Sequence, residues 1–154
     1  MSERIAIIGS RYYPLISLVR EFVWELPPDA VVISGAAKGV DSTAAAAADH
    51  RHLSVIEYPI PHDGLEELRG DEFAVEYKRR AGERNQKIVD MADRLIAYWD
   101  GVSGGTLDAI RRARLKGIPI EIIGPKGYAL TAASHPALSA LWAATREERR
   151  RESA

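Results

Sequence analysis

Length, composition and charge limit this chain to a few classes of protein. Its 154 residues, 46% hydrophobic and 28% charged, suffice for one well-buried core but not for two typical domains. A formal net charge of −1 provides no basic surface for nucleic-acid backbones, so nucleic acid is not the expected partner. The absence of Cys excludes disulfides, thiolate nucleophiles and Cys-based zinc sites. Residues 1–4 lead into a strand-like run without a signal-peptide pattern, so we expect a cytoplasmic protein with no membrane span.

Five short apolar runs alternate with helical patterns, at residues 5–8, 30–33, 53–57, 95–99 and 119–123. This alternation is typical of an α/β fold whose parallel sheet is covered by helices on both faces. Three of the runs have a continuously apolar stretch, as central strands do, whereas Ser54, Glu57 and Glu121 interrupt the other two and indicate edge strands. The sequence therefore predicts a Rossmann-like open sheet with strand order 3-2-1-4-5 over residues 1–125.

Four helical patterns connect these runs. They are expected after Pro14, from Asp41 or Ser42 through an Ala-rich block, over roughly residues 79–91, and from Gly105 to Gly117. The small side chains of the Ala-rich block suit close packing of its helix on the sheet.

Two segments fall outside the alternation. Residues 58–77 are too long for a simple connection and predict either a partly ordered lid over the site or a surface excursion. Residues 126–154 are expected to form a turn and a terminal helix from about 136 to 151, with the charged run at 146–152 as a frayed, solvated end. In that helix Leu138, Leu141 and Trp142 pack either on the domain itself or on a second copy of the chain, and we expect a homo-oligomer.

The predicted ligand site is formed by the loops that follow the first, second and fourth strands. Ligands of open α/β sheets bind at the carboxyl ends of the strands, where the strand order reverses. Glycines there let backbone N–H groups approach a phosphate, and a helix N-terminus adds partial positive charge. The candidate phosphate- and ligand-binding residues of these loops are Gly9, Ser10, Arg11, Ser34, Gly35, Lys38, Gly39, Asp41, Ser103, Gly104, Gly105 and Thr106.

Several candidates have a second interpretation. Arg11 either clamps a phosphate through its guanidinium or is an ordinary surface arginine, and Lys38 adds a further full charge. Asp41 either caps the second helix or accepts a hydrogen bond from a ribose hydroxyl. Arg84 and Asn85 belong to the third helical pattern, and they either reach into the crevice beside the phosphate loops or simply cap the helix.

The loops exclude two common nucleotide motifs. Gly9 stands alone after the first strand, so the G-x-G-x-x-G pattern of NAD(P)-binding domains is absent, and neither glycine loop fits the G-x-x-x-x-G-K-[ST] pattern of a P-loop. The four histidines are scattered and form no metal-ligating set. We therefore expect no cofactor and no metal. Trp99, at the rim of the crevice, is the one tryptophan considered for base stacking.

Short motifs follow one another along the core in a distinctive order: Ile7-Ile8-Gly9-Ser10-Arg11, Ser34-Gly35-Ala36-Ala37-Lys38-Gly39-Val40-Asp41, Arg84-Asn85 with Ile88-Val89, Ala92-Asp93 and Gly105-Thr106. Together they resemble the SLOG superfamily of Rossmann-like nucleotide-sensing proteins, over roughly residues 4–124. Relatives in that superfamily include phosphoribohydrolases of the LONELY GUY type, formerly called lysine decarboxylases, and DNA-processing proteins that bind single strands. The resemblance implies nucleotide binding by a Rossmann-like domain.

The resemblance also assigns roles to particular residues. It places Arg84 where the phosphoribohydrolases have an arginine, and it implies a phosphate site made by Gly35, Gly39, Gly104, Gly105 and Thr106. Their motif P-G-G-x-G-T-x-x-E is met only at Gly105-Thr106, and the position of its catalytic glutamate is occupied by Ala109. Because alanine cannot transfer protons, Asp108 or Glu83 would have to replace that glutamate.

Three functions remain open from the sequence. The first is binding or sensing of a small phosphate-bearing nucleotide, because two phosphate loops meet at the switch point without a complete catalytic set. The second is a phosphoribohydrolase that cleaves the N-glycosidic bond of a nucleoside monophosphate, with Arg84 on the phosphate and Asp108 or Glu83 as the catalytic acid. The third is single-stranded DNA binding, which the near-neutral charge disfavours.

Overall fold

The computed structural model describes residues 2–153, which form a parallel sheet of five strands in the order β3-β2-β1-β4-β5. The strands are β1 (Arg4–Gly9), β2 (Val31–Ser34), β3 (Ser54–Glu57), β4 (Arg94–Tyr98) and β5 (Ile120–Ile123). The central strand β1 pairs with β2 on one side and with β4 on the other. The α/β fold class, the strand order and the two edge strands predicted from the sequence are confirmed.

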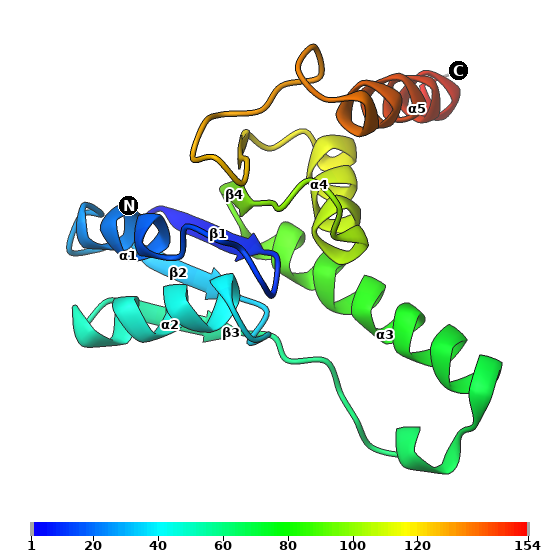
Figure 1. Cartoon of the computed structure of the whole chain (residues 1–154), viewed down its shortest axis with the longest axis horizontal. Helices are drawn as coiled ribbons and strands as arrows, with labels where there is room; N and C mark the ends of the chain where they lie inside the picture. Colours follow the sequence, from blue (N-terminus) through cyan, green and yellow to red (C-terminus); the bar gives the residue numbers. More distant parts are fainter. Residues whose placement is uncertain (1, 154) are drawn as a thin grey trace.

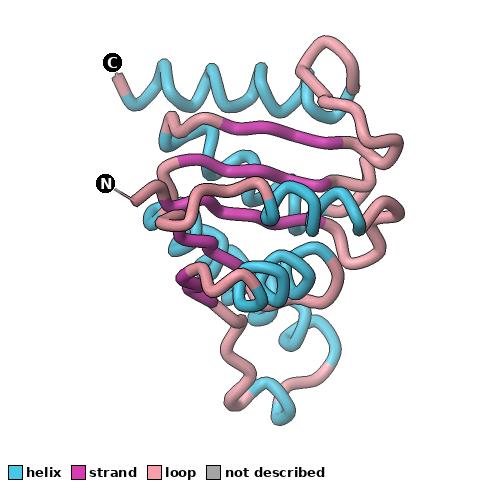
Figure 2. The backbone as a smooth tube through the Cα atoms, turned by 90° about the vertical axis from the view of Figure 1, so that its left-hand side faces the viewer, coloured by secondary structure: helices cyan, strands magenta, loops and turns pink. Residues whose placement is uncertain are grey.

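Helices cover both faces of the sheet (Figures 1 and 2). They are α1 (Ser17–Trp24), α2 (Val40–His50), α3 (Gly70–Met91), α4 (Gly104–Lys116) and α5 (Pro136–Glu152), with a short 3₁₀ turn η1 (Leu65–Glu67) before α3. Helices α1 and α2 pack on one face, and α3, α4 and α5 form the other layer. Helix α4 ends at Lys116, and the glycine predicted to stop it, Gly117, follows in the left-handed conformation with a φ of 87°.

Alternation along β1 explains why the sheet has two apolar faces. Ile5 and Ile7 belong to the core under α1 and α2, whereas Ala6 and Ile8 belong to the core on the opposite side. All four side chains are at most 5% exposed, as expected for a central strand. The sheet is therefore held at its centre, and the loops at its carboxyl edge begin from fixed positions.

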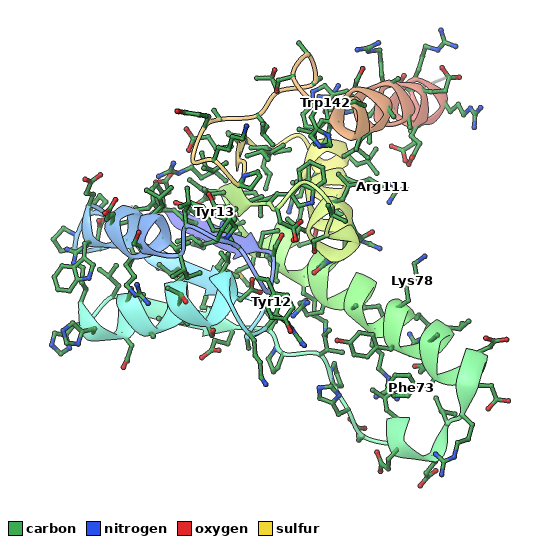
Figure 3. The ribbon with its side chains drawn as sticks, viewed as in Figure 1. Tyr12, Tyr13, Phe73, Lys78, Arg111 and Trp142 are labelled. Carbon is green, nitrogen blue, oxygen red and sulfur yellow. The ribbon has the colours of Figure 1, made fainter. Side chains whose placement is uncertain are left out.

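Helix α3 begins at Gly70, nine residues before the predicted start at 79, so residues 70–77 form the first turns of this helix. Their exposure agrees with the predicted surface excursion. The extra turns carry few buried side chains and project from the body of the domain, where Phe73 and Lys78 lie (Figure 3). Ion pairs of Arg79 with Glu76 and Glu83, spaced as neighbours on one helix face, stabilise these turns. An amphipathic pattern could not predict them, because their stability depends on surface charge pairs.

Helix α5 is ordered through the charged run, so the predicted frayed end at 146–152 is wrong. The Arg111 guanidinium pairs with the Glu148 carboxylate at 3.0 Å, and Arg114 donates to the hydroxyl of Thr145 at 2.9 Å. Leu138 is fully buried in the core of the same chain, and Trp142 packs beside α4 under the guanidinium of Arg114 (Figure 3). The apolar side of the terminal helix therefore packs on its own domain.

No helix within residues 2–153 combines the length and the apolar character needed to span a lipid bilayer.

Candidate functional site

The loops after β1 and β4 are joined at the carboxyl edge of the sheet. The N–H of Ser10 donates to the carbonyl of Tyr98 at 3.0 Å, and the buried Ser10 hydroxyl accepts from the N–H of Asp100 at 3.0 Å. A Cβ atom at Gly9 would lie 2.3 Å from the carbonyl oxygen of Tyr98 and 2.7 Å from Val40, so only glycine permits this approach. Gly9 and Ser10 thus hold the switch point together.

Asp41 links the loops after β1 and β2. Its two carboxylate oxygens accept from the N–H groups of Gly9 and Gly35, each at 3.1 Å, and the side chain is 4% exposed. The N-cap of α2 is Gly39, so the prediction that Asp41 caps this helix is wrong. Instead of reaching outward, the carboxylate organises the backbone of both loops.

Burial raises the pKa of Asp41 to about 6, against the lowering effects of Arg84 and of backbone N–H groups. The ordinary pKa of the group is 3.8, so removal from water dominates over these favourable partners. Burial lowers the pKa of the neighbouring Arg84 below its ordinary value, although the charge of Asp41 raises it in part. The two groups are therefore electrostatically coupled inside the protein.

Arg84 joins α3 to the loop after β2. Its Nη1 donates to the carbonyl of Gly35 and, at 3.4 Å, to that of Tyr58, while Nε donates to the Asn85 side chain at 3.0 Å. A Cβ atom at Gly35 would lie 2.6 Å from the Arg84 guanidinium and 2.5 Å from the Asp41 carboxylate, so this glycine leaves room for both charges. Arg84 lies well inside α3, so the prediction that it caps the helix is wrong.

Asn85 extends the network to α4. Its side-chain amide donates to the carbonyl of Gly105 at 3.3 Å and to the Asp108 carboxylate at 3.0 Å. Asp108 also pairs with Arg112 at 2.8 Å. The structure therefore brings together the three predicted loops and the Arg84-Asn85 pair through one continuous series of hydrogen bonds.

The first backbone N–H groups of α4 have no partner within the helix. Its first intrahelical bond runs from Leu107 to the carbonyl of the N-cap Ser103, so the N–H groups of Gly104, Gly105 and Thr106 precede the helical ladder. Both glycines are exposed, and a Cβ atom built on either would meet nothing within 4 Å. The Asp100 carboxylate fixes the preceding turn by accepting from the N–H groups of residues 102 and 103, at 2.9 and 2.7 Å. The turn before this helix is thus fixed by hydrogen bonds, and the two glycines that follow it are exposed.

No protein-family model matches the chain, and no curated protein matches its sequence. Among solved structures, the fold is similar to that of DNA processing protein A (DprA) from Streptococcus pneumoniae, with a TM-score of 0.62 and 20% sequence identity. The match covers 78% of this chain and 50% of the DprA chain, so this chain spans about half the length of that protein. At this identity the likeness shows a shared Rossmann-like fold.

Other predicted ligand residues have different surroundings. Ser34 is fully buried, and its hydroxyl donates to the carbonyl of Asp41 at 3.0 Å while accepting from the N–H of Ala36 at 3.1 Å. Gly39 has a φ of 92°, and a Cβ there would lie 2.3 Å from the carbonyl oxygen of Arg11. The side chains of Arg11 and Lys38 are exposed. Ser34 and Gly39 therefore stabilise the conformation of these loops, and the side chains of Arg11 and Lys38 lie on their exposed surface.

The residues predicted to replace a catalytic glutamate lie apart from one another. Glu83 is exposed and pairs with Arg79 on the solvent side of α3, while Asp108 is half-buried between Asn85 and Arg112. Ala109 is 1% exposed and belongs to the core. Within residues 2–153 there is no cluster of three or more carboxylates and histidines suited to a metal ion.

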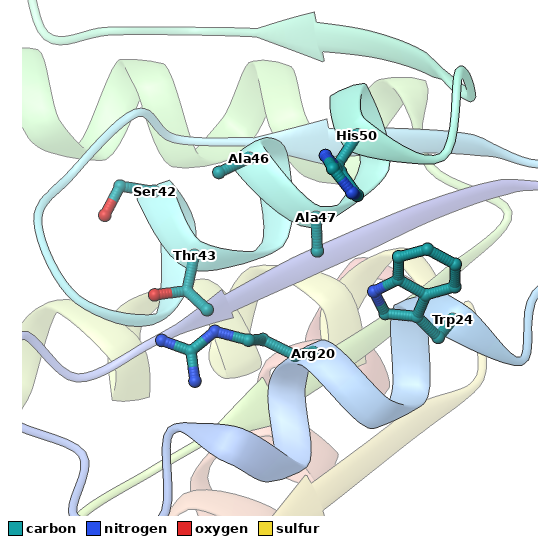
Figure 4. A pocket seen from close by; sticks show the side chains of 7 residues that line it. All are labelled: Arg20, Trp24, Ser42, Thr43, Ala46, Ala47 and His50. Carbon is teal, nitrogen blue, oxygen red and sulfur yellow. The ribbon is translucent and has the colours of Figure 1, made fainter.

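Besides a small cavity of about 100 Å³ lined by Tyr58 and Arg84, two larger cavities lie near the site. One, of about 640 Å³, runs between α1 and α2, with Ser42 and Thr43 at one end and Trp24 and His50 at the other (Figure 4). The second, of about 430 Å³, lies beside the N-terminus of α4 and includes Asp100 and His135. Sequence reasoning identified neither of those last two residues as candidates. The Asp-Gly pair directly after the fourth strand was the available signal for Asp100, whereas His135 is 35 residues away in the chain.

Proposed function

We propose that this chain binds a phosphate-bearing nucleotide at the carboxyl edge of its sheet, with the phosphate on the N-terminus of α4. The observation that carries the proposal is the start of that helix, where the exposed residues Gly104 and Gly105 have N–H groups that precede the helical ladder and open space at their Cβ positions. Such N–H groups, with the partial positive charge of a helix N-terminus, favour an anion.

The network behind the helix end supports this proposal. The amide of Asn85 orients the backbone at Gly105, and Asp100 fixes the turn that leads into α4. Because the N–H groups are already arranged, an arriving phosphate would need little reordering of the loop. Arg84 supplies a cation beside this network, and its Nη2 takes part in no hydrogen bond among residues 2–153.

Binding is favoured over N-glycosidic hydrolysis by the state of the two candidate carboxylates. Asp108 is engaged by Asn85 and Arg112, and Glu83 faces solvent with Arg79. A general acid needs a carboxyl group free to reach the substrate, with a pKa suited to proton transfer. Neither of the two carboxylates that could replace the catalytic glutamate is therefore free to reach a substrate at the proposed anion site.

The test is binding of AMP, ribose 5-phosphate and inorganic phosphate to the whole chain, measured by isothermal titration calorimetry and thermal shift. Gly105→Glu places a carboxylate in the first turn of α4, where it suits the helix dipole but competes with phosphate. We expect this variant to stay folded and to lose at least tenfold in affinity for AMP. Ala140→Glu adds the same charge at an exposed position on α5 and should bind as the unmodified chain does.

Two results would contradict the proposal. One is an absence of binding by every phosphate compound at millimolar concentration. The other is equal binding by the Gly105→Glu and Ala140→Glu variants, which would place the ligand elsewhere.

A labelled single-stranded oligonucleotide belongs in the same panel, because DprA is a DNA-processing protein by name. Retention of the oligonucleotide at low salt without mononucleotide binding would favour single-stranded DNA binding over nucleotide binding.

A further inference from the structure

The cavity of about 430 Å³ beside α4 has the dimensions of a small-molecule site. One wall is the loop of residues 100–102 after β4, and the other is the segment from Gly124 to His135 after β5. The loops after β1 and β2 lie on the opposite side of β4 in the strand order. The cavity is thus separate from the Asp41–Arg84 network but adjacent to the same helix end.

Large apolar side chains border this cavity and remain exposed. Val102 is 84% exposed and Tyr128 is 73% exposed, and Pro125 and Leu130 complete the apolar lining. Isolated exposed apolar residues are common, but several around one cavity favour a ligand that covers them. A flat, largely apolar ring fits such a wall.

Besides the exposed Lys126, two polar groups of opposite character line the same cavity, His135 and Asp100. The Nδ1 atom of His135 accepts from the N–H of Ala137 at 3.2 Å, so in the neutral ring the proton is on Nε2, which becomes a donor. That Nε2 lies toward the loop of residues 100–102, 3.6 Å from a Cβ built on Gly101. Asp100 uses its Oδ1 for backbone N–H groups, and its carboxylate contributes acceptors. A ligand with both donors and acceptors on its edge would match.

Trp99 does not offer the stacking surface considered from the sequence. It is 1% exposed, its Nε1 donates to the carbonyl of Ser103 at 3.0 Å, and the His135 ring lies against it with centroids 4.7 Å apart. Trp99 therefore supports both the turn before α4 and the histidine. Of these two rings, His135 is the one that lines the cavity, where Tyr128 also lies.

The cavity and the helix end are close enough for one ligand. Val102 and Gly105 are three residues apart, so their Cα atoms are separated by at most about 11 Å. Asp100 fixes the backbone between them. A nucleoside monophosphate can extend from one to the other.

We propose that this cavity binds the nucleobase of a nucleotide whose phosphate lies on α4, with Val102 and Tyr128 as walls and His135 and Asp100 facing the polar edge of the base. This assignment rests on the phosphate site proposed above. It identifies the ligand class as intact nucleotides with an aromatic heterocycle, in preference to sugar phosphates.

The test compares AMP with ribose 5-phosphate, because the two share the phosphate and ribose and differ in the base. Calorimetry on the whole chain should give at least tenfold tighter binding of AMP. Val102→Ser and Tyr128→Ser remove exposed side chains while keeping the backbone hydrogen bonds of both residues. Each should reduce this preference at least threefold and change the affinity for ribose 5-phosphate less than twofold. Val75→Ser, 69% exposed on the projecting part of α3, is the matched control and should leave both affinities unchanged.

A second readout locates the base directly. In ¹³C-methyl NMR spectra, AMP should shift the methyl signals of Val102 and Leu130, and ribose 5-phosphate should leave Leu130 unshifted. Equal binding of AMP and ribose 5-phosphate would overturn the base site while the phosphate site stands. A preference that persists undiminished in both serine variants would also overturn it. Failure of every phosphate compound to bind would refute the proposed function, and the base site with it.

Discussion

Replacing Asp41 with Asn tests whether a buried charge organises the switch point. The side chain is 4% exposed, and burial raises its pKa from the ordinary 3.8 to about 6. A group whose pKa is higher in the folded than in the unfolded state adds stability fully below the unfolded pKa. That stability is lost as pH rises through the folded pKa. A shift of about 2 units corresponds to about 3 kcal/mol of unfolding free energy, lost mainly between pH 4 and pH 6.

The assay is urea unfolding of the unmodified chain and of Asp41→Asn, at 25 °C and at intervals from pH 4 to pH 8. Asn cannot accept from both Gly9 and Gly35, and that cost is the same at every pH. The pH dependence therefore isolates the effect of the charge. The free energy of unfolding of Asp41→Asn, relative to that of the unmodified chain, should rise by about 2 to 3 kcal/mol between pH 4 and pH 7. Other carboxylates, such as Asp93 with its lowered pKa, are common to both proteins and cancel in the difference.

A difference that stays flat from pH 4 to pH 7 would refute the reasoning, because it would mean that Asp41 keeps its ordinary pKa in the folded protein. A difference of opposite slope would mean that the partners of the carboxylate, Arg84 above all, outweigh its burial. Asp49→Asn provides the control on the same helix, since Asp49 is exposed. An equally strong pH dependence in that variant would point to a general effect of removing a negative charge.

Three further predictions concern stability and use urea unfolding as well. Arg84→Ala should destabilise the fold by about 3 kcal/mol at pH 7, because it leaves Asp41 charged and buried, and by less at pH 5, where Asp41 is largely protonated. Equal losses of stability at both pH values would show that Arg84 and Asp41 are not coupled. Gly9→Ala should cost about 3 kcal/mol of stability, because its Cβ would lie 2.3 Å from a carbonyl oxygen of β4. Gly105→Ala, with open space at its Cβ, should add up to about 1 kcal/mol of helix stability. Similar effects at both glycines would contradict the geometry. Leu138→Ala should cost about 3 kcal/mol, because the side chain is fully buried, and amide exchange along α5 should quicken; a loss under 1 kcal/mol would mean that α5 is not part of the core.

The sheet could be predicted from the sequence because its signal is local. Each strand of a parallel sheet covered on both faces is a short apolar run, and the polar interruptions at Ser54 and Glu121 distinguished the edges. The projecting half of α3 could not be predicted in the same way. Its turns have no apolar stripe, and the ion pairs of Arg79 and Arg80 with Glu76 that stabilise them hold the pKa of Glu76 well below its usual range.

The meeting of the candidate loops was predictable, but the contacts of their side chains were not. Glycine-rich loops after buried strands were expected at one edge of the sheet, and hydrogen bonds join them there. Whether Asp41 faces outward or inward depends on how the loops after β1 and β2 meet. Its partner Gly9 is 32 residues away in the chain. The same reason explains why His135 was missed: it approaches Trp99 only after β5 and its following turn are in place.

The glycines of the three loops fall into two physical groups, and this difference bears on where a ligand binds. At Gly9, Gly35 and Gly39 an added Cβ would meet protein atoms at 2.3 to 2.5 Å, so packing alone explains them. At Gly104 and Gly105 it would meet nothing within 4 Å, and packing explains neither. Glycine in a helix costs about 0.5 to 1 kcal/mol relative to alanine, so two glycines in the first turn of α4 reduce stability without a structural return. Close approach of a ligand to the backbone would account for that cost, and this reasoning favours the proposed phosphate position at α4 over the loop of residues 34–41.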